Sequence, residues 1–312
     1  MRDAFTRALS ELAAEDPRVM LLTGDLGFGV LTPFAAAYPK QFLNVGVAEQ
    51  NMAGIAVGLA REGRIVFTYS IANFNTLRCL EQLRNDACYH AANVKVVSVG
   101  GGFCYGALGI SHHATEDLAI MRSLPGLTVV APGDPVEAGA LTRAVGETPG
   151  TFYLRLGRGG EPVVHRGAPH VVLGKALRLC DGADVAILSV GGMLSNAMVA
   201  AELLAQQGVA ASVTSIHTIK PLDESAIVAL AREVGLIVTV EEHIACGGLG
   251  GAVAEVVAGL SGARARVLRI GVGSGFSETI GSQDHLRQVH GLSPDGIIRR
   301  ILETLQERIY GH

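Results

Sequence analysis

Tryptophan is absent from the sequence, and aromatic residues make up only 5% of it. A carbohydrate-stacking binding module is therefore not expected. Cysteine is also sparse, and no two cysteines form a CxxC pair, which argues against both a disulfide framework and a zinc site. We expect the cysteines to be reduced residues of the core, as is usual in a cytoplasmic protein. They are Cys79, Cys88, Cys104, Cys180 and Cys246.

The sequence also lacks long runs of one kind of residue. No block of like charges occurs, and the formal net charge is only −4. A basic face for nucleic acid is therefore not expected. No apolar run reaches the ~18 residues of a membrane-spanning helix. Residues 1–18 lack the apolar segment of a signal peptide. Together these absences predict a cytoplasmic protein with no nucleic-acid or membrane partner.

What the sequence does contain is a regular alternation of helical and strand patterns. The 312 residues are 49% hydrophobic and include 40 glycines, a length that suits two domains. Such alternation is typical of a doubly wound parallel sheet. In the first half we expect helices over 3–14, 49–62, 76–90, 112–126 and 135–146, and strands over 19–26, 65–70, 94–102, 127–134 and 151–158.

The alternation lapses after residue 158, where glycine, proline and charged residues become frequent, and restarts near residue 184. We therefore predict an α/β fold of two doubly wound domains. The first spans residues 1–165, a linker spans 166–183, and a smaller domain spans 184–312.

The most informative stretch is NVGVAEQNMAGIAVGLA, from Asn44 to Ala60. A strand here delivers Glu49 to the start of a helix rich in small residues. A carboxylate at that position favourably meets the positive end of the helix dipole, a purely structural role. Partial burial would instead favour the protonated carboxyl group, which can donate a hydrogen bond to a heteroaromatic nitrogen. The residues alone leave both interpretations open.

VGVAEQNMAGIAVGLA resembles the pyrimidine-binding domain of transketolases and of the similar 1-deoxyxylulose-5-phosphate synthases. The resemblance runs through almost the whole chain and implies thiamine diphosphate as cofactor. It implies that Glu49 hydrogen-bonds the aminopyrimidine ring, with Gln50 and Arg78 supporting the site. The other similar segments are Thr23–Gly27, Phe67–Ser70, Leu77–Asp86, Gly109–Asp117, Pro132–Ala138, Tyr153–Arg158, His217–Glu224 and Val240–Glu255.

One element of the family pattern is missing. The Mg²⁺ that accompanies the diphosphate is held in this family by a GDG motif followed by an asparagine, and no GDG occurs in this sequence. Mg²⁺ needs oxygen ligands beside the phosphates. We therefore predict no metal ligands in this chain. A separate N-terminal, diphosphate-binding subunit would hold Mg²⁺, in an α2β2 heterotetramer, and this chain alone would be inactive.

The resemblance assigns further cofactor contacts. Asp25 and Leu26 match residues beside the thiazolium ring, where Leu26 would keep the cofactor bent. An aromatic residue should stack on the pyrimidine. A gapless alignment places Asn75 at that position, which departs from the family, so we choose the neighbouring Phe74.

The resemblance also assigns substrate contacts. His112 matches a histidine that contacts substrate oxygens and would act in catalysis, and His113 follows it as a second candidate. Both follow a strand and a glycine-rich loop, where ligands bind in open α/β sheets. Arg158 and Arg2 match phosphate-binding arginines, whose planar forks suit phosphate.

Three departures bear on the substrate. Leu108 replaces an aspartate that reads a sugar hydroxyl, Gly29 replaces a serine, and the loop Gly100–Gly106 lacks a phosphate-contacting histidine. Losing a hydrogen-bonding partner changes substrate discrimination strongly. We therefore expect a sugar-type substrate that differs from an ordinary pentose phosphate.

The predicted activity is transfer of a two-carbon ketol unit from a ketose donor to an aldehyde acceptor. Alternatives within the cofactor class are a 1-deoxyxylulose-5-phosphate-synthase-like enzyme and the β-subunit of a keto-acid dehydrogenase. Outside that class stand a non-catalytic binding subunit and a nucleotide-binding oxidoreductase. The last would use GGGFCYGALG as its phosphate loop, although this loop lacks the usual glycine spacing.

Overall fold

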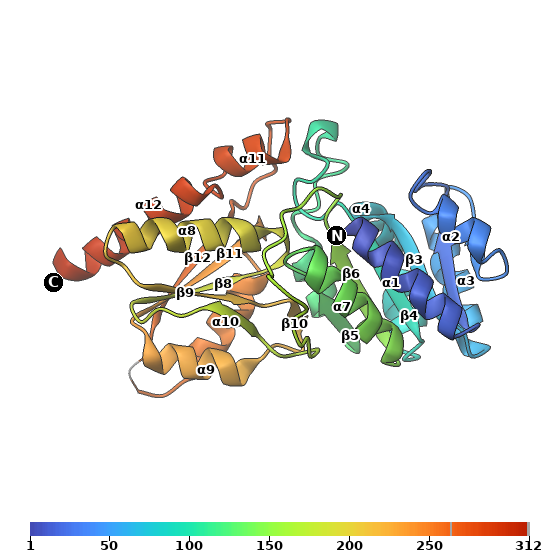
Figure 1. Cartoon of the computed structure of the whole chain (residues 1–312), viewed down its shortest axis with the longest axis horizontal. Coiled ribbons are helices and arrows are strands. Elements are labelled where there is room, and N and C mark those ends of the chain that lie inside the picture. Colours follow the sequence, from blue (N-terminus) through green and yellow to red (C-terminus); the bar gives the residue numbers. More distant parts are fainter. Residues whose placement is uncertain (263, 311–312) are drawn as a thin grey trace.

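The computed structural model describes residues 1–262 and 264–310 and contains two sheets joined side by side (Figure 1). The first sheet has the strand order β10-β5-β6-β4-β3-β1-β2. All its neighbouring strands are parallel except β10, which pairs with β5 in the antiparallel sense. The strands are β1 (Val19–Thr23), β2 (Phe42–Asn44), β3 (Ile65–Ile71), β4 (Val94–Val99), β5 (Leu127–Val130), β6 (Thr151–Leu156) and β10 (Thr218–Lys220).

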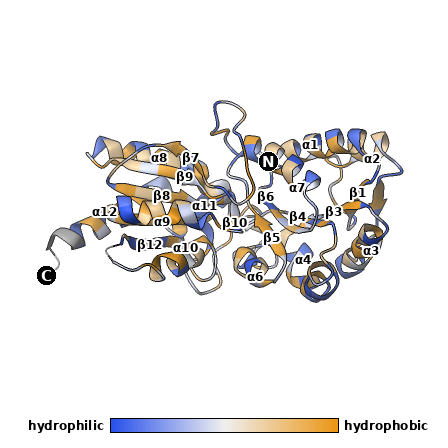
Figure 2. Cartoon of the chain, turned by 90° about the horizontal axis from the view of Figure 1, so that it is seen from below, coloured by the Kyte–Doolittle hydropathy of each residue, from blue (hydrophilic) through white to orange (hydrophobic). Residues whose placement is uncertain are grey.

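Helices cover both faces of this sheet because neighbouring strand residues point to opposite sides. Leu21 and Phe67 pack with α1 (Arg2–Glu15) and α7 (Pro135–Glu147), whereas Leu22 and Val66 pack with α3 (Glu49–Arg61). The strands of both sheets are mostly hydrophobic in Figure 2, as expected for strands buried on two faces. A short helix, α2 (Thr32–Ala37), lies between β1 and β2 in the chain.

The second sheet has the strand order β12-β11-β8-β9-β7, parallel except for the antiparallel edge strand β7. Its strands are β7 (Leu177–Cys180), β8 (Val185–Ser189), β9 (Ala211–Ser215), β11 (Leu236–Ile244) and β12 (Arg266–Val272). Its helices are α8 (Leu194–Gln206), α9 (Glu224–Glu233), α10 (Leu249–Ala258), α11 (Gln283–Val289) and α12 (Pro294–Tyr310).

The predicted fold class, two α/β domains built on largely parallel sheets, is confirmed. Two strands cross the expected division of the chain. The strand β7 lies inside the range 166–183 that we expected to be a linker, and it pairs with β9. The strand β10 follows β9 in the chain but joins the first sheet. The domain boundaries themselves stay a prediction.

Two expected helices differ from the structure, and both differences concern the candidate site. The range 76–90 contains a 3₁₀ turn (Leu77–Cys79), α5 (Leu80–Gln82) and a π-helical turn (Leu83–Cys88), and Thr76 separates it from a further short helix, α4 (Ala72–Asn75). The Thr76 hydroxyl donates to the Ala72 carbonyl at 2.6 Å, a bond that competes with helix continuation. The helix expected from residue 112 is α6 (Asp117–Ser123). The residues before it form turns and bends, with one isolated bridge between Gly102 and Ala114.

Two further expectations concern reduced cysteines in the core and the lack of a membrane-spanning helix. The described residues include no disulfide, and all five cysteines are free. Cys79 and Cys88 are buried, as expected for core residues, but Cys246 is exposed. Among residues 1–262 and 264–310, no helix is both long and apolar enough to cross a bilayer. A cytoplasmic location stays a prediction.

Candidate active site

Glu49 lies where the carboxyl ends of β1, β2 and β3 meet, as the first residue of α3. Its side chain is only 2% exposed. Arg78 Nη1 donates to its Oε2 atom at 2.6 Å, and the Ser70 hydroxyl lies 3.4 Å from its Oε1 atom. A carboxyl end of parallel strands is where open α/β sheets bind ligands. The buried acid predicted from the sequence is therefore in such a place.

An aromatic face lies next to this acid. The Arg78 guanidinium sits over the Phe74 ring, 4.5 Å from its centroid, and the His112 ring meets Phe74 edge-on at 5.3 Å. Asn75 instead turns into the sheet, where its amide donates to the Val97 carbonyl at 3.0 Å and to the hydroxyl of a strand threonine at 3.3 Å. Asn75 is thus buried, whereas Phe74 beside it is half-buried, and the choice of Phe74 as the stacking residue stays a prediction.

The loop after β1 borders the same edge. Asp25 has a positive φ of 57° and is tied to Asn44, which accepts from its N–H at 3.0 Å and donates to its carboxylate at 2.9 Å. Leu26 is half-buried against the core under α1 and α7. Gln50 is exposed on α3. Asp25 and Leu26 thus border the candidate cofactor site, while Gln50 faces solvent in this chain.

Arg158, one of the two candidate phosphate residues, lines a separate cavity of about 440 Å³. Arg158, Tyr105 and Leu108 line it, together with the segment Gly281–Gln283 of the second domain. A Cβ atom built on Gly159 would lie 3.8 Å from an Arg2 guanidinium nitrogen, so Arg2 reaches the neighbouring backbone. The charges of Arg2 and Arg158 oppose the effect of burial, which raises the pKa of Tyr105.

The two histidines have different surroundings. His112 is half-buried; its Nδ1 atom lies 2.9 Å from the Ser111 hydroxyl, and its ring is 6.2 Å from the Tyr105 ring. Burial, helped by the neighbouring His113, lowers the pKa of His112 and favours the neutral imidazole. His113 is only 2% exposed and its Nε2 atom lies 3.1 Å from the Gly106 carbonyl. His112 thus borders Phe74, whereas His113 packs behind the loop.

The glycines of GGGFCYGALG make room for the chain's own side chains. A Cβ atom on Gly100 would lie 2.2 Å from the Tyr105 ring, and one on Gly101 would lie 2.4 Å from Arg155 Nε. At Gly102, where φ is +64°, it would lie 2.7 Å from Glu242. A loop filled in this way has no open cradle for a phosphate. The structure therefore argues against the nucleotide-binding alternative.

The donor set fits the pyrimidine half of thiamine diphosphate. A buried carboxyl group can hydrogen-bond a ring nitrogen, and Phe74 supplies an aromatic face beside it. The diphosphate half needs a cation site rich in oxygen ligands. Within residues 1–262 and 264–310, no three His, Cys, Asp or Glu side chains are grouped to hold a metal ion.

Comparisons with known proteins agree with this geometry. The family model "Transketolase, pyrimidine binding domain" matches residues 1–161, and "Transketolase, C-terminal domain" matches residues 174–297. The chain therefore belongs to the transketolase family.

One relative of about the same length as this chain is a single subunit of a transketolase. The chain is 38% identical to an apulose-4-phosphate transketolase subunit of Phocaeicola vulgatus, over 98% of this chain and 97% of that one. A solved structure of a split-gene transketolase, described as an inactive β4 tetramer, superposes with a TM-score of 0.88. That structure is 36% identical in sequence to this chain, and the alignment covers 98% of this chain and 97% of that one. A 1-deoxy-D-xylulose-5-phosphate synthase of Thermomicrobium roseum is 37% identical over 97% of this chain, which spans 48% of that protein.

Several residues near the site were missed by sequence reasoning. Ser70 and Asn44 contact Glu49 and Asp25, and Tyr105 lines the cavity beside Arg158. Asn44 ends β2 and Ser70 is the last residue but one of β3, and the carboxyl ends of these strands meet at Glu49, which is a signal that could have found them. Tyr105 sits in an irregular loop, and no periodic pattern predicts its direction.

Proposed function

We propose that this chain is the pyrimidine-binding subunit of a two-subunit, thiamine-diphosphate-dependent transketolase that transfers a two-carbon ketol unit between sugars. The observation that carries the proposal is the buried Glu49 carboxyl group beside Phe74, at the carboxyl edge of a sheet whose domain belongs to the transketolase family. A buried acid at a ligand-binding edge favours a catalytic subunit over a non-catalytic binding subunit.

Each residue then has a task that its position allows. Thiamine diphosphate, when bound, supplies a thiazolium ring that accepts electrons during carbon–carbon cleavage. Glu49 would hold a proton at the pyrimidine ring nitrogen, and Phe74 would present its face to the same ring. Asp25 and Leu26 would border the thiazolium side, and Arg78 would orient the Glu49 carboxylate.

The proposed substrate residues lie between Phe74 and the cavity or line the cavity itself. His112, whose pKa burial lowers, would act as a neutral imidazole that polarises substrate oxygens. Arg158, which is exposed at the cavity, would anchor a phosphate together with Arg2. Leu108, 58% exposed at the same cavity, would contact carbon rather than a hydroxyl group.

The partner is an N-terminal, diphosphate-binding subunit that supplies the Mg²⁺ ligands, in an α2β2 heterotetramer. Two comparisons support it: the P. vulgatus relative is itself one subunit of a transketolase, and the β4 tetramer of a split-gene transketolase is inactive. A relative of matching length favours transketolase over the synthase alternative, because the P. vulgatus protein, which this chain covers to 97%, is a transketolase subunit.

The test is reconstitution with the N-terminal subunit, thiamine diphosphate and Mg²⁺, assayed with a ketose phosphate donor and an aldose phosphate acceptor. We expect ketol transfer by the assembled complex and none by either subunit alone. Robust turnover by this chain alone would contradict the two-subunit proposal. Release of CO₂ from pyruvate on condensation with an aldehyde, without ketol transfer, would favour the synthase alternative.

A further inference from the structure

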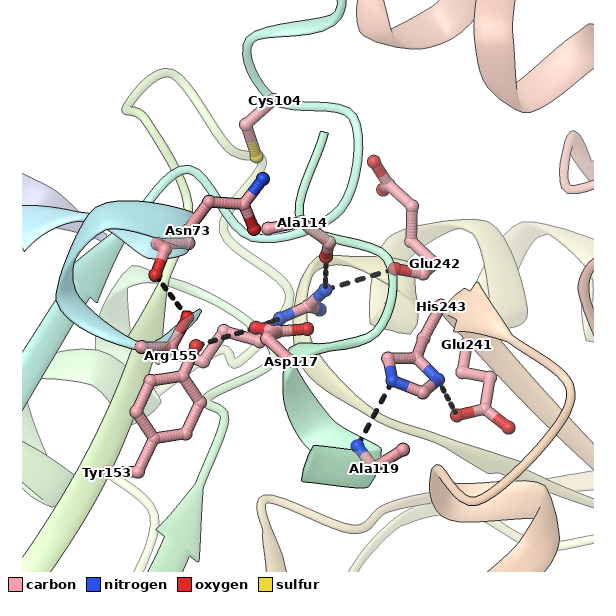
Figure 3. A network of polar contacts seen from close by, with 12 residues as sticks. Asn73, Cys104, Ala114, Asp117, Ala119, Tyr153, Arg155, Glu241, Glu242 and His243 are labelled. Atoms are coloured by element: carbon pink, nitrogen blue, oxygen red, sulfur yellow. Dashed lines mark hydrogen bonds and ion pairs between the residues drawn. The ribbon is translucent and has the colours of Figure 1, made fainter. Parts of the chain in front are cut away.

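Glu242, near the end of β11 in the second domain, reaches across to the loop that follows β4 in the first domain. Its side chain is 3% exposed, and its Oε1 atom accepts from the Phe103 N–H at 2.6 Å. The backbone of Gly102 lies so close to it that only glycine fits there. Figure 3 shows the Glu242 carboxylate on the side of the Cys104 loop, away from Glu241 and His243.

Two side chains of the helix α11 also donate hydrogen bonds to this carboxylate. Gln283 Nε2 donates to its two oxygens at 2.9 and 3.0 Å, and Arg287 Nε donates to Oε2 at 2.7 Å. Gln283 and Arg287 are four residues apart and therefore share one face of the helix. Leu286, also on α11, is buried against Gly106, where an added Cβ atom would lie 2.4 Å from its Cδ1.

The opposite side of the same loop faces the candidate substrate cavity. Tyr105 and Leu108 line that cavity together with Arg158, and the Gly106 carbonyl contacts His113. Gly281–Gln283, at the start of α11, form the cavity's wall from the second domain. One loop of about ten residues is thus held from behind by Glu242 and α11 while it presents Tyr105 and Leu108 to the cavity.

We propose that Glu242 is a positioning residue for substrate binding: with α11 it fixes the Gly100–Gly109 loop, so the second domain helps to build the substrate pocket. The inference rests on the proposed function. Replacing Glu242 by glutamine puts an NH₂ group opposite N–H donors only, and at least one donor loses its acceptor. Small displacements of groups that orient substrate carry large kinetic costs.

The neighbouring residue Glu241 offers a matched control. It is also buried, but it points to the other side of β11, where its two oxygens accept from the N–H groups of Leu249 and Gly250 at 2.8 Å each. It therefore holds the start of α10 inside the second domain. Glu241→Gln should lower the melting temperature without moving the Gly100–Gly109 loop, whereas a general effect of domain destabilisation would appear in both variants.

The experiment uses the assembled complex and three measurements: KM for the ketose phosphate, C2–H exchange of bound thiamine diphosphate, and deuterium uptake of the 100–109 peptide. For Glu242→Gln we expect KM to rise about 10- to 100-fold, uptake at 100–109 to increase and C2–H exchange to stay normal. For Glu241→Gln we expect normal KM and normal uptake. Unchanged KM in a folded Glu242→Gln complex, or an equal rise in Glu241→Gln, would overturn the inference.

Gln283→Leu provides a second variant if Glu242→Gln does not assemble. It removes the donors to Glu242 but keeps the contact between Glu242 and Arg287. Because Gln283 also lines the cavity, the readout for this variant is deuterium uptake at 100–109 alone. We expect a smaller increase than in Glu242→Gln, and no increase would overturn the inference. Failure of the proposed function would be detected by a different measurement, the activity of the wild-type complex. A wild-type complex without ketol transfer would refute that function, while deuterium uptake would still report whether Glu242 holds the loop.

Discussion

Arg78 donates a 2.6 Å hydrogen bond to Glu49, and the same guanidinium lies 4.5 Å from the centre of the Phe74 ring. Glu49 is 2% exposed, whereas Arg78 is 45% exposed, so the cation covers the acid from the solvent side. One side chain thus connects the buried carboxyl group to the aromatic face, although 29 residues separate Arg78 from Glu49. This contact defines the candidate cofactor site more closely than any single motif does.

Phe74→Ala tests the aromatic face of the site. An aromatic stacking contact contributes about 0.5–1.5 kcal/mol beyond area burial. The dissociation constant of thiamine diphosphate in the complex should therefore rise roughly 3- to 10-fold, measured by cofactor titration of activity. Tyr89→Ala, which removes an aromatic residue that is 83% exposed elsewhere on the domain, is the control. Equal affinity in wild type and Phe74→Ala would show that another residue stacks on the pyrimidine.

Arg158→Ala tests phosphate anchoring at the cavity. Loss of charge-assisted hydrogen bonds should weaken binding by about 1.5–3 kcal/mol, seen as a higher KM for a phosphorylated substrate with normal cofactor affinity. Arg143→Ala is the matched control, because Arg143 pairs with Glu15 on the outer face of α7. An unchanged KM would mean that Arg158 is structural or that the substrate carries no phosphate.

His217 gives the stability of the chain a defined dependence on pH. The side chain is buried, and burial, helped by nearby His165, lowers its pKa to about 4. The unfolded chain therefore binds more protons below pH 6.5, so stability is lost as pH falls from 6.5 toward 4. Between pH 7.5 and 5 we expect a loss of about 2 kcal/mol from this group. Urea denaturation of wild type and His217→Gln at pH 7.5 and pH 5 measures this loss of stability. An equal pH dependence in the two proteins would contradict its assignment to His217.

Much of the fold could be predicted because buried parallel strands leave continuous apolar runs. The strands β1, β3, β4 and β6 lie within or close to the expected ranges. The edge strands β7 and β10 were missed, since each has three or four residues and is antiparallel to its neighbour. Pairing of such short strands is decided by distant residues, which local patterns do not contain.

The candidate site was predictable only where the chain is regular. Glu49 stands at a strand–helix junction, so its location followed from the pattern. Phe74 and His112 lie in irregular segments, and their 5.3 Å contact is visible only in the structure. The role of Glu242 was even harder to predict from sequence, because its partners Phe103 and Arg287 are 139 and 45 residues away along the chain. Assignment of these residues to cofactor and substrate stays a prediction.

The most direct test of the account is Glu49→Gln in the assembled complex, read as deuterium exchange at C2 of bound thiamine diphosphate. Glutamine is nearly isosteric, so folding and assembly should survive, as circular dichroism can check. An amide cannot exchange a proton with the pyrimidine nitrogen as a carboxyl group can, and exchange should slow by ~10²-fold or more. Glu62→Gln, on the exposed end of the same helix, should exchange normally. Normal exchange in Glu49→Gln would reduce Glu49 to a helix-start carboxylate and contradict the thiamine assignment.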